Sequence, residues 1–400
     1  MKKIISVILV IALAAALLIG CNNNNGAQPE SSPAAPADSP AAAPAESPAA
    51  APAESPSAAP AESPAASSAG AASDAPAQPD SGGWDFSDAN KVNLTYAIYL
   101  AESDATAIDT ARYFDMIKEY TEGTVDYTMY AGQSLVNGDE ELDAVRNGLA
   151  DVTFFPVAYG SGQMPVGYIL EYPGVAFNNG VAASYTFRDW FNQLNLPELS
   201  DFHLLYAIGQ GNGCFMTTFE VNSFADLKGK QIRCGAALTP IFDAYGIFPT
   251  VMVFSEVYEA LRTGVVQGFY GMQHAGNSAK LQEVTSYVTI DPYYIGGYIM
   301  VMNKDVWASL TADQQAAIEA ATEDAFVEFL AVGRDVDAAL ALEIFRDEGL
   351  TIVNLSDEDL AEMGRANGPI QEAYASSVQG GMEALELYRE LAAKYNAMYP

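Results

Sequence analysis

The chain has 400 residues, half of them hydrophobic, and its 51 Asp and Glu against 18 Lys and Arg give a formal net charge of −33. This acidic balance opposes binding to nucleic acid or to anionic lipid headgroups, because both are negatively charged. It does not exclude an anionic ligand, since one partly buried arginine can dominate the potential of its own pocket.

The first 21 residues have the layout of an export signal. Two lysines precede an apolar run over residues 4–19, which is too short and wrongly flanked for a stable transmembrane span. The run ends in Leu-Ile-Gly-Cys21, which resembles the lipobox of bacterial lipoproteins, in which the cysteine is acylated and the chain is cut before it. We therefore expect an exported protein that is lipid-anchored at Cys21 to the outer face of the cytoplasmic membrane, or periplasmic. An ordinary signal peptide with a chance cysteine is the alternative.

Residues 22–82 are nearly all Ala, Pro, Ser, Glu and Gln, and Pro-Ala-Glu-Ser-Pro recurs every eight residues from Pro44, Pro52 and Pro60. No large aliphatic or aromatic side chain occurs between Cys21 and Trp84, so this stretch cannot bury enough apolar surface to fold. The composition predicts a disordered, semi-stiff spacer ahead of a folded domain over 83–400. A ligand for a proline-recognising domain is the other interpretation of the repeat.

Strand and helix patterns alternate after the spacer. Period-two alternation and helical spacing predict strand 91–100, helix 106–120, strand 125–130, helix 139–149 and strand 151–155. The order βαβαβ predicts a largely parallel sheet with helices on its faces.

The second half of the chain continues the α/β pattern. Further strands are expected over 202–208, 214–219, 231–234 and 293–302. Capping boxes at Thr311–Gln314 and Ser356–Asp359 predict a long amphipathic helix to about Phe345 and a C-terminal helical segment. The part of the chain after the spacer has about 315 residues, and a stretch of that size usually divides into lobes. We therefore expect two α/β lobes joined by crossing strands and a long helix, with a ligand cleft between them.

The sequence contains no recognisable catalytic, cofactor or metal motif, and we expect a protein that is not an enzyme. Its two histidines are far apart, and residues 209–213, Gly-Gln-Gly-Asn-Gly, resemble half of a dinucleotide loop that strand-like residues follow instead of a helix. A hinge, or a close approach of backbone to ligand, explains that loop better. Cys214 and Cys234 form either a disulfide or two buried thiols, and no histidine cluster accompanies them.

Two motifs in the middle of the chain are informative. Asp226-Leu-Lys-Gly229 precedes an apolar strand that ends in Arg233, and Phe254-Ser-Glu-Val-Tyr258 follows about twenty residues later, opening a helix that Gly264 can end. In this order and spacing they closely resemble the solute-binding subunits of TRAP transporters (tripartite ATP-independent periplasmic transporters, DctP type). Weaker matches are Asn147 to Asp151 upstream and, downstream, Asn303, Trp307, Leu310 and Gln314.

The resemblance implies a type II periplasmic-binding-protein fold with lobe I over about 88–209 and 297–336 and lobe II over about 210–296 and 337–395. It also implies an extracytoplasmic receptor that captures a small organic carboxylate by closure of the lobes and delivers it to TRAP membrane subunits. A binding protein for an ATP-driven transporter, or a chemosensory receptor of the same fold, is the alternative.

Within this family pattern Arg233 takes the place of the arginine that pairs with the substrate carboxylate, and Phe254 that of an aromatic which lines the pocket. Further substrate contacts are expected near the cleft, at Phe155, Tyr159, Glu102, Asp104, Asn212, Tyr270, Gln273 and His274. The aromatic residues could instead pack in the core, and the carboxylates could simply be acids at the start of a helix. His274 could be a buried side chain whose hydrogen bonds are satisfied within the protein.

The sequence departs from the family pattern at two points. Gln267 replaces the usual Asp before Gly268, and the strand near Gly213 lacks the second arginine of sialic-acid-binding members. With one charge partner fewer, and with tyrosine, methionine and histidine in the following segment, we expect a monocarboxylate with an apolar or aromatic body.

Overall fold

The computed structural model describes residues 83–252 and 254–400. The predicted signal peptide over 1–21, the lipid attachment at Cys21 and the spacer over 22–82 lie outside this range. No helix within it has the length and apolar character needed to cross a membrane. Cys214 and Cys234 are both buried and unpaired with each other, so the structure favours two free thiols over a disulfide.

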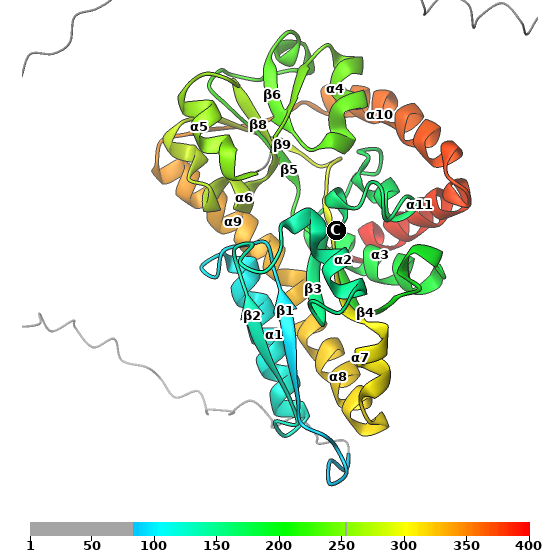
Figure 1. Ribbon diagram of the computed structural model, residues 1–400. Helices are drawn as coiled ribbons and strands as arrows, with labels where there is room; N and C mark the ends of the chain where they lie inside the picture. The colour runs from blue at the N-terminus through cyan, green and yellow to red at the C-terminus, as the bar shows by residue number, and fades with distance from the viewer. Residues whose placement is uncertain (1–82, 253) are drawn as a thin grey trace, which may run out of the picture. The chain divides into compact units, whose positions relative to one another are not determined.

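The first of two sheets has the strand order β2-β1-β3-β10-β4 (Figure 1). Its strands are β1 (Val92–Ala97), β2 (Val125–Tyr130), β3 (Val152–Pro156), β4 (Phe202–Gly209) and β10 (Gly297–Asn303). β1 pairs in parallel with β2 and with β3, as the predicted βαβαβ order requires, whereas β10 runs antiparallel to both β3 and β4. The strand that was predicted over 293–302 begins at Gly297 in the structure, because the residues before it form the turn that enters this sheet.

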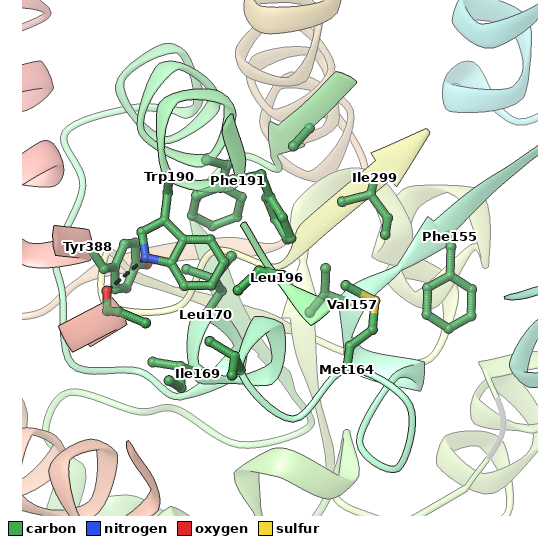
Figure 2. Packing of buried hydrophobic residues seen from close by; sticks show 14 of the residues in the cluster. Phe155, Val157, Met164, Ile169, Leu170, Trp190, Phe191, Leu196, Ile299 and Tyr388 are labelled. Atoms are coloured by element: carbon green, nitrogen blue, oxygen red, sulfur yellow. Dashed lines mark hydrogen bonds between the residues drawn. The ribbon is translucent and has the colours of Figure 1, made fainter. Parts of the chain in front are cut away.

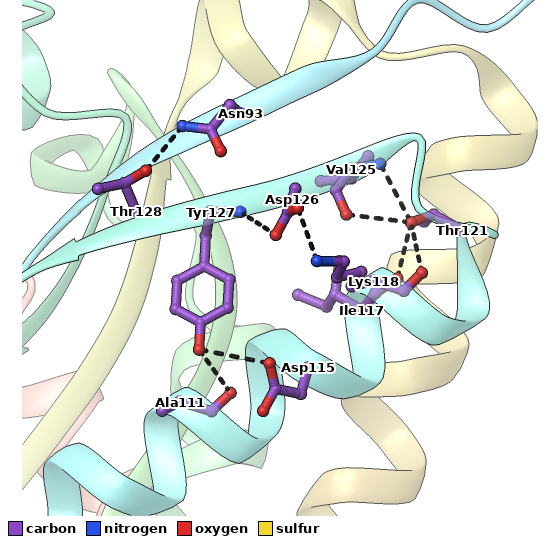
Figure 3. Close-up of polar contacts among 10 residues, drawn as sticks. All are labelled: Asn93, Ala111, Asp115, Ile117, Lys118, Thr121, Val125, Asp126, Tyr127 and Thr128. Atoms are coloured by element: carbon purple, nitrogen blue, oxygen red, sulfur yellow. Dashed lines mark hydrogen bonds and ion pairs between the residues drawn. The ribbon is translucent and has the colours of Figure 1, made fainter.

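Helix α1 (Ala105–Tyr120) begins at Asp104, whose carboxylate accepts a hydrogen bond from the Thr106 backbone amide at 2.8 Å. Figure 3 shows how the C-terminal half of α1 is attached to β2. Lys118 pairs with Asp126 at 2.7 Å, and the Thr121 hydroxyl accepts from the Val125 amide at 3.2 Å. These contacts fix the β1–α1–β2 unit, and with it the loop before α1 that borders the site.

Three helices bury their apolar faces in one core cluster with β3 and β4. They are the short α2 (Glu141–Arg146), α3 (Gly180–Gln193) and α11 (Gly381–Met398). At the centre of this cluster the Trp190 indole is fully buried and donates a hydrogen bond to the Ala384 carbonyl of α11 at 2.7 Å (Figure 2). The predicted lobe boundaries put residues 337–395 in lobe II. The structure instead places α11 on α3 beside the first sheet, because Leu385 and Tyr388 belong to this core.

The second sheet has the order β11-β9-β5-β8-β6-β7. Its strands are β5 (Gly213–Thr217), β6 (Gln231–Cys234), β7 (Phe248–Val251), β8 (Gly268–Met272), β9 (Tyr287–Asp291) and β11 (Thr351–Asn354). The helices of this half are α4 (Thr239–Tyr245), α5 (Val257–Arg262), α6 (Gln273–Ser278) and α10 (Asp357–Ser377). Two further buried clusters form its core. The two sheets confirm the expected two-lobed α/β class.

Two connections between strands, one long helical stretch and the α10–α11 connection join the lobes. The β4–β5 and β9–β10 connections are hydrogen-bonded to each other, from the Gln210 amide to the Gly296 carbonyl at 3.0 Å and from the Gly213 amide to the Tyr294 carbonyl at 2.8 Å. After the short α7 (Lys304–Ser309), α8 (Ala312–Ala325) begins at the predicted Thr311–Gln314 capping box and contacts α1. A π-helical turn, Phe326–Leu330, separates it from α9 (Ala331–Asp347), which packs on α6 of the other lobe. The predicted single helix is thus interrupted.

Candidate ligand-binding site

Two adjoining cavities lie between the lobes. The inner one holds about 830 Å³ and the outer one about 1610 Å³, in both cases counting the space open to solvent. Both are lined by residues that directly follow strands: Tyr99 and Leu100 after β1, Ala158 and Tyr159 after β3, and Gly235 after β6. The cleft is therefore at the carboxyl ends of parallel strands, where α/β folds bind ligands.

Arg233 is the one cationic side chain among the described residues that line the two cavities. It is half-buried on β6, and its Nε and Nη2 donate to the Met252 carbonyl at 3.3 and 3.1 Å. Its guanidinium carbon lies 5.8 Å from the ring centre of Phe254 and 5.5 Å from that of Phe269. No carboxylate of the described chain lies within 4.0 Å of it. Burial lowers the pKa of Arg233, and Tyr159 acts in the opposite direction.

Aromatic rings form much of the inner cavity wall. The hydroxyls of Tyr99 and Tyr298 are hydrogen-bonded at 2.6 Å, and the Tyr99 ring meets the edge of Tyr159 at 5.6 Å between centres. Tyr270 and Tyr294 are stacked at 5.2 Å. Such flat, rigid walls suit a flat apolar body, and their hydroxyls supply a few polar contacts.

Two buried carboxyl groups hold this wall in place. Glu171, the last residue of the turn Gly167–Glu171, accepts from the Gly297 amide at 3.0 Å and the Tyr294 hydroxyl at 3.2 Å. Burial raises the pKa of Glu171 to about 7. Asp291 accepts a hydrogen bond from the Tyr270 hydroxyl, and burial raises the pKa of Asp291 to about 6. Glu171 was missed by sequence reasoning, although one acid inside the apolar run over 166–172 was an available signal.

A second polar group of cleft residues comes from α1 and α6. The carboxylate of Asp104 caps α1 and also accepts from the Ser278 hydroxyl of α6 at 2.8 Å, which joins the two lobes. His274 is 9 % exposed, and its Nδ1 has no hydrogen-bond partner among the described residues. Burial, and then the charge of Arg334, lowers the pKa of His274 to about 4, so its imidazole is neutral at pH 7.

The structure separates the ten expected substrate contacts into two sets. Six line the cavities: Asp104, Tyr159, Arg233, Phe254, Tyr270 and His274. The other four line neither: Phe155 is fully buried in the core of the first lobe, Gln273 is buried on α6, Asn212 is in the β4–β5 connection and Glu102 is exposed. Phe155 packs in one core cluster with residues of α2 and α3, in agreement with the alternative of core packing.

The described residues contain no group of three or more His, Cys, Asp or Glu side chains that could hold a metal ion. The chemistry of the cleft is one guanidinium, several phenol hydroxyls, carboxylates and one neutral imidazole. These groups can bind and orient a small polar molecule.

Comparison with known proteins agrees with this geometry. Residues 96–377 match the model of the DctP family, bacterial extracellular solute-binding protein family 7. The C4-dicarboxylate-binding periplasmic protein DctP of Rhodobacter capsulatus is 24% identical over 307 residues, which cover 71% of this chain and 89% of that protein. A solute-binding protein of a Sulfitobacter strain is 31% identical over 201 residues, 48% of this chain and 58% of that protein.

Solved structures share the fold. A TRAP solute-binding protein from Rhodoferax ferrireducens with copurified benzoate has a TM-score of 0.71 and 20% identity, covering 77% of this chain and 100% of its own. One from a marine metagenome with 3-hydroxybenzoate has a TM-score of 0.71 and 22% identity, covering 76% and 99%. Since the family model covers well over half of the chain, this protein belongs to the DctP family of extracellular solute-binding proteins, the receptors of TRAP transporters, and is not an enzyme.

Proposed function

We propose that this receptor captures a small monocarboxylate with a flat, apolar or aromatic body, and that Arg233 binds its carboxylate. The observation that supports this most is the half-buried guanidinium without a carboxylate partner in the described chain. Nη1 makes no hydrogen bond to a described residue, and Nη2 uses only one of its two hydrogens on Met252. A ligand carboxylate can take the free donors, and the planar fork of guanidinium suits a two-point contact.

The charges of the cleft favour one carboxylate over two. Asp104, Asp139 and Glu171 line the cavities with Arg233, so a second ligand carboxylate would have acids and no further cation as neighbours. The rings of Tyr99, Tyr159 and Phe254 would then cover the apolar body of the ligand. Benzoate and 3-hydroxybenzoate in structures of the same fold are ligands of this kind.

Capture would occur by closure of the lobes over the ligand, with the two connections and the long helical stretch as hinges. The loaded receptor would then deliver its ligand to TRAP membrane subunits. A lipid at Cys21 and the spacer over 22–82 would keep it near those subunits and raise their effective concentration.

The test is a thermal-shift screen of the purified protein against organic acids, followed by calorimetry. Benzoate, cyclohexanecarboxylate and the benzenedicarboxylates form a matched set, and Arg233→Ala is compared with Arg365→Ala, which removes an exposed arginine of α10 outside the cleft. We expect monocarboxylates to stabilise the wild type and Arg365→Ala by mass action, but not Arg233→Ala. Stabilisation that ignores Arg233, or much tighter binding of a dicarboxylate of equal skeleton, would contradict the proposal.

A further inference from the structure

Beyond Arg233, the cleft contains a second polar cluster, formed by Asp104, Thr106 and His274, which we call the His274 subsite. All three residues line the inner cavity. Thr106 and His274 are buried, at 3 % and 9 % exposure, and Asp104 is half-buried. No hydrogen bond or ion pair joins Arg233 to any of them among the described residues, so the subsite is separate from the polar contacts of Arg233.

The hydrogen bonds within the subsite leave acceptor positions for a ligand on Asp104 and His274, beside the Thr106 hydroxyl and one ring nitrogen, which can donate. Each carboxylate oxygen of Asp104 already accepts one bond, from the Thr106 amide and the Ser278 hydroxyl, yet a carboxylate offers about four lone-pair positions. The buried Nδ1 of His274 has no described partner. Because the ring is neutral, one of its two nitrogens is an acceptor.

Charged side chains lie behind the subsite. Arg334 of α9 is 1 % exposed, donates to the Thr106 hydroxyl and pairs with Asp109 and with Asp337, the latter at 2.9 Å. Asp104 has no ion-pair partner among the described residues, so the charge of its carboxylate is not neutralised by a direct contact. The unpaired carboxylate of Asp104 favours a hydrogen-bond donor beside it and opposes an anion, whereas burial, and then the charge of Arg334, lowers the pKa of the His274 imidazole.

We propose that the His274 subsite binds a hydrogen-bond-donating group of the ligand, so that the preferred substrates are monocarboxylates with a hydroxyl or ammonium substituent on the apolar body. This inference rests on the proposed function, because Arg233 must hold the carboxylate end. An unpartnered polar group that is buried in a site imposes a large cost on any ligand that leaves it unpaired. The donor group would provide that partner.

The test is calorimetry on the purified protein with ring-substituted benzoates that differ in one group. Hydroxy-, aminomethyl- and methoxybenzoates with the substituent at position 3 or 4 are compared with benzoate. The methoxy group has the size of the aminomethyl group and the oxygen acceptor of the hydroxyl, with one added methyl, but it has no donor. We expect at least one hydroxy or aminomethyl acid to bind about five- to tenfold more tightly than its methoxy analogue, the scale of one hydrogen bond. The two donor series distinguish a hydroxyl subsite from an ammonium subsite.

Two variants assign the preference to the subsite. His274→Phe keeps a ring of similar size without polar atoms, and it should reduce the donor preference to less than about twofold, because ligands without a donor then no longer leave a buried nitrogen unpaired. Asp104→Asn keeps the α1 cap, since asparagine is also a good N-cap, and removes the charge, so it should weaken aminomethyl acids more than hydroxy acids. Its melting temperature, and that of His274→Phe, are measured alongside.

Equal binding of donor and methoxy acids at both ring positions would overturn the inference, as would a donor preference that survives both variants. If the acids bind through Arg233 without a donor preference, only this inference fails. If no acid binds, or binding ignores Arg233, the proposed function fails as well.

Discussion

Two arginines should respond in opposite ways to the same substitution. Arg233 is half-buried in the cleft without a described carboxylate partner, whereas Arg334 is 1 % exposed and pairs with Asp109 and Asp337. Methionine is a suitable replacement in both places, because it is unbranched and of similar length. We expect Arg233→Met to remove ligand binding with little effect on folding, and Arg334→Met to weaken folding.

The magnitudes follow from the contacts. Arg233→Met loses a shared hydrogen bond to Met252, about 1 kcal/mol, and two aromatic contacts of about 0.5–1 kcal/mol each. Against this, the variant no longer desolvates an unpaired charge, and a methionine sulfur packs well on aromatic rings. The free energy of unfolding should therefore change by less than about 1 kcal/mol. Arg334→Met leaves two half-buried carboxylates without their cation and should cost about 3 kcal/mol.

The assay is urea unfolding at pH 7, followed by far-UV circular dichroism, with and without a carboxylate that stabilises the wild type. We expect the midpoint of Arg233→Met to match that of the wild type without ligand and not to move when ligand is added. The midpoint of Arg334→Met should be lower in both conditions. A loss of stability in Arg233→Met as large as that in Arg334→Met would refute the assignment of Arg233 to ligand binding.

Three further outcomes are expected. Since burial raises the pKa of Glu171 to about 7, the folded state keeps a proton that the unfolded state releases near pH 4.5, and stability falls as pH rises through this window. Glu171→Gln should reduce this dependence on pH and raise the free energy of unfolding by about 2–3 kcal/mol at pH 8. An unchanged slope of melting temperature against pH would contradict this. Trp190→Phe should cost about 2–3 kcal/mol in urea unfolding, through a lost hydrogen bond and a cavity, whereas Trp307→Phe, at a half-buried position, should cost less than half as much. Cys214 and Cys234 are buried and burial raises the pKa of both thiols, so thiol reagents should label them only after unfolding, and fast labelling of the native protein would show otherwise.

Local sequence signals predicted several of the regular elements well, although α3, β9 and β11 were not predicted. β2 spans the predicted residues 125–130, and the Thr311–Gln314 capping box exists in both directions, from the Thr311 amide to Gln314 and from the Gln314 amide to Thr311. Both features depend on residues close together in the chain, so the sequence contains all that is needed to find them.

Features that depend on distant residues were not accessible in this way. An apolar stripe on α11 indicates a buried face but not its partner, and the partner, α3, lies about 200 residues away. The π-helical turn Phe326–Leu330 keeps the apolar spacing of the helices on either side, so periodicity cannot reveal it.

The candidate site shows the same division. Arg233 and Phe254 could be selected from motifs, because their spacing from neighbouring residues marks them. Glu171 and Tyr294 come from connections whose course depends on how the lobes meet, and Tyr298 comes from the start of β10; no spacing rule singles them out. Phe155 and Tyr159 are only four residues apart, yet the strand ends between them and only Tyr159 reaches the cleft.

The net charge of −33 and a carboxylate ligand are compatible because they act at different distances. Surface charges are screened over about 10 Å at 0.1 M salt, whereas a guanidinium in a partly desolvated cleft acts on a carboxylate at hydrogen-bond distance. The acids that line the cleft then decide what else the ligand can contain: a second carboxylate would meet Asp104, Asp139 and Glu171 without a described cation to pair with. A single arginine among acids and aromatic rings would therefore favour one carboxylate on the ligand and oppose a second one.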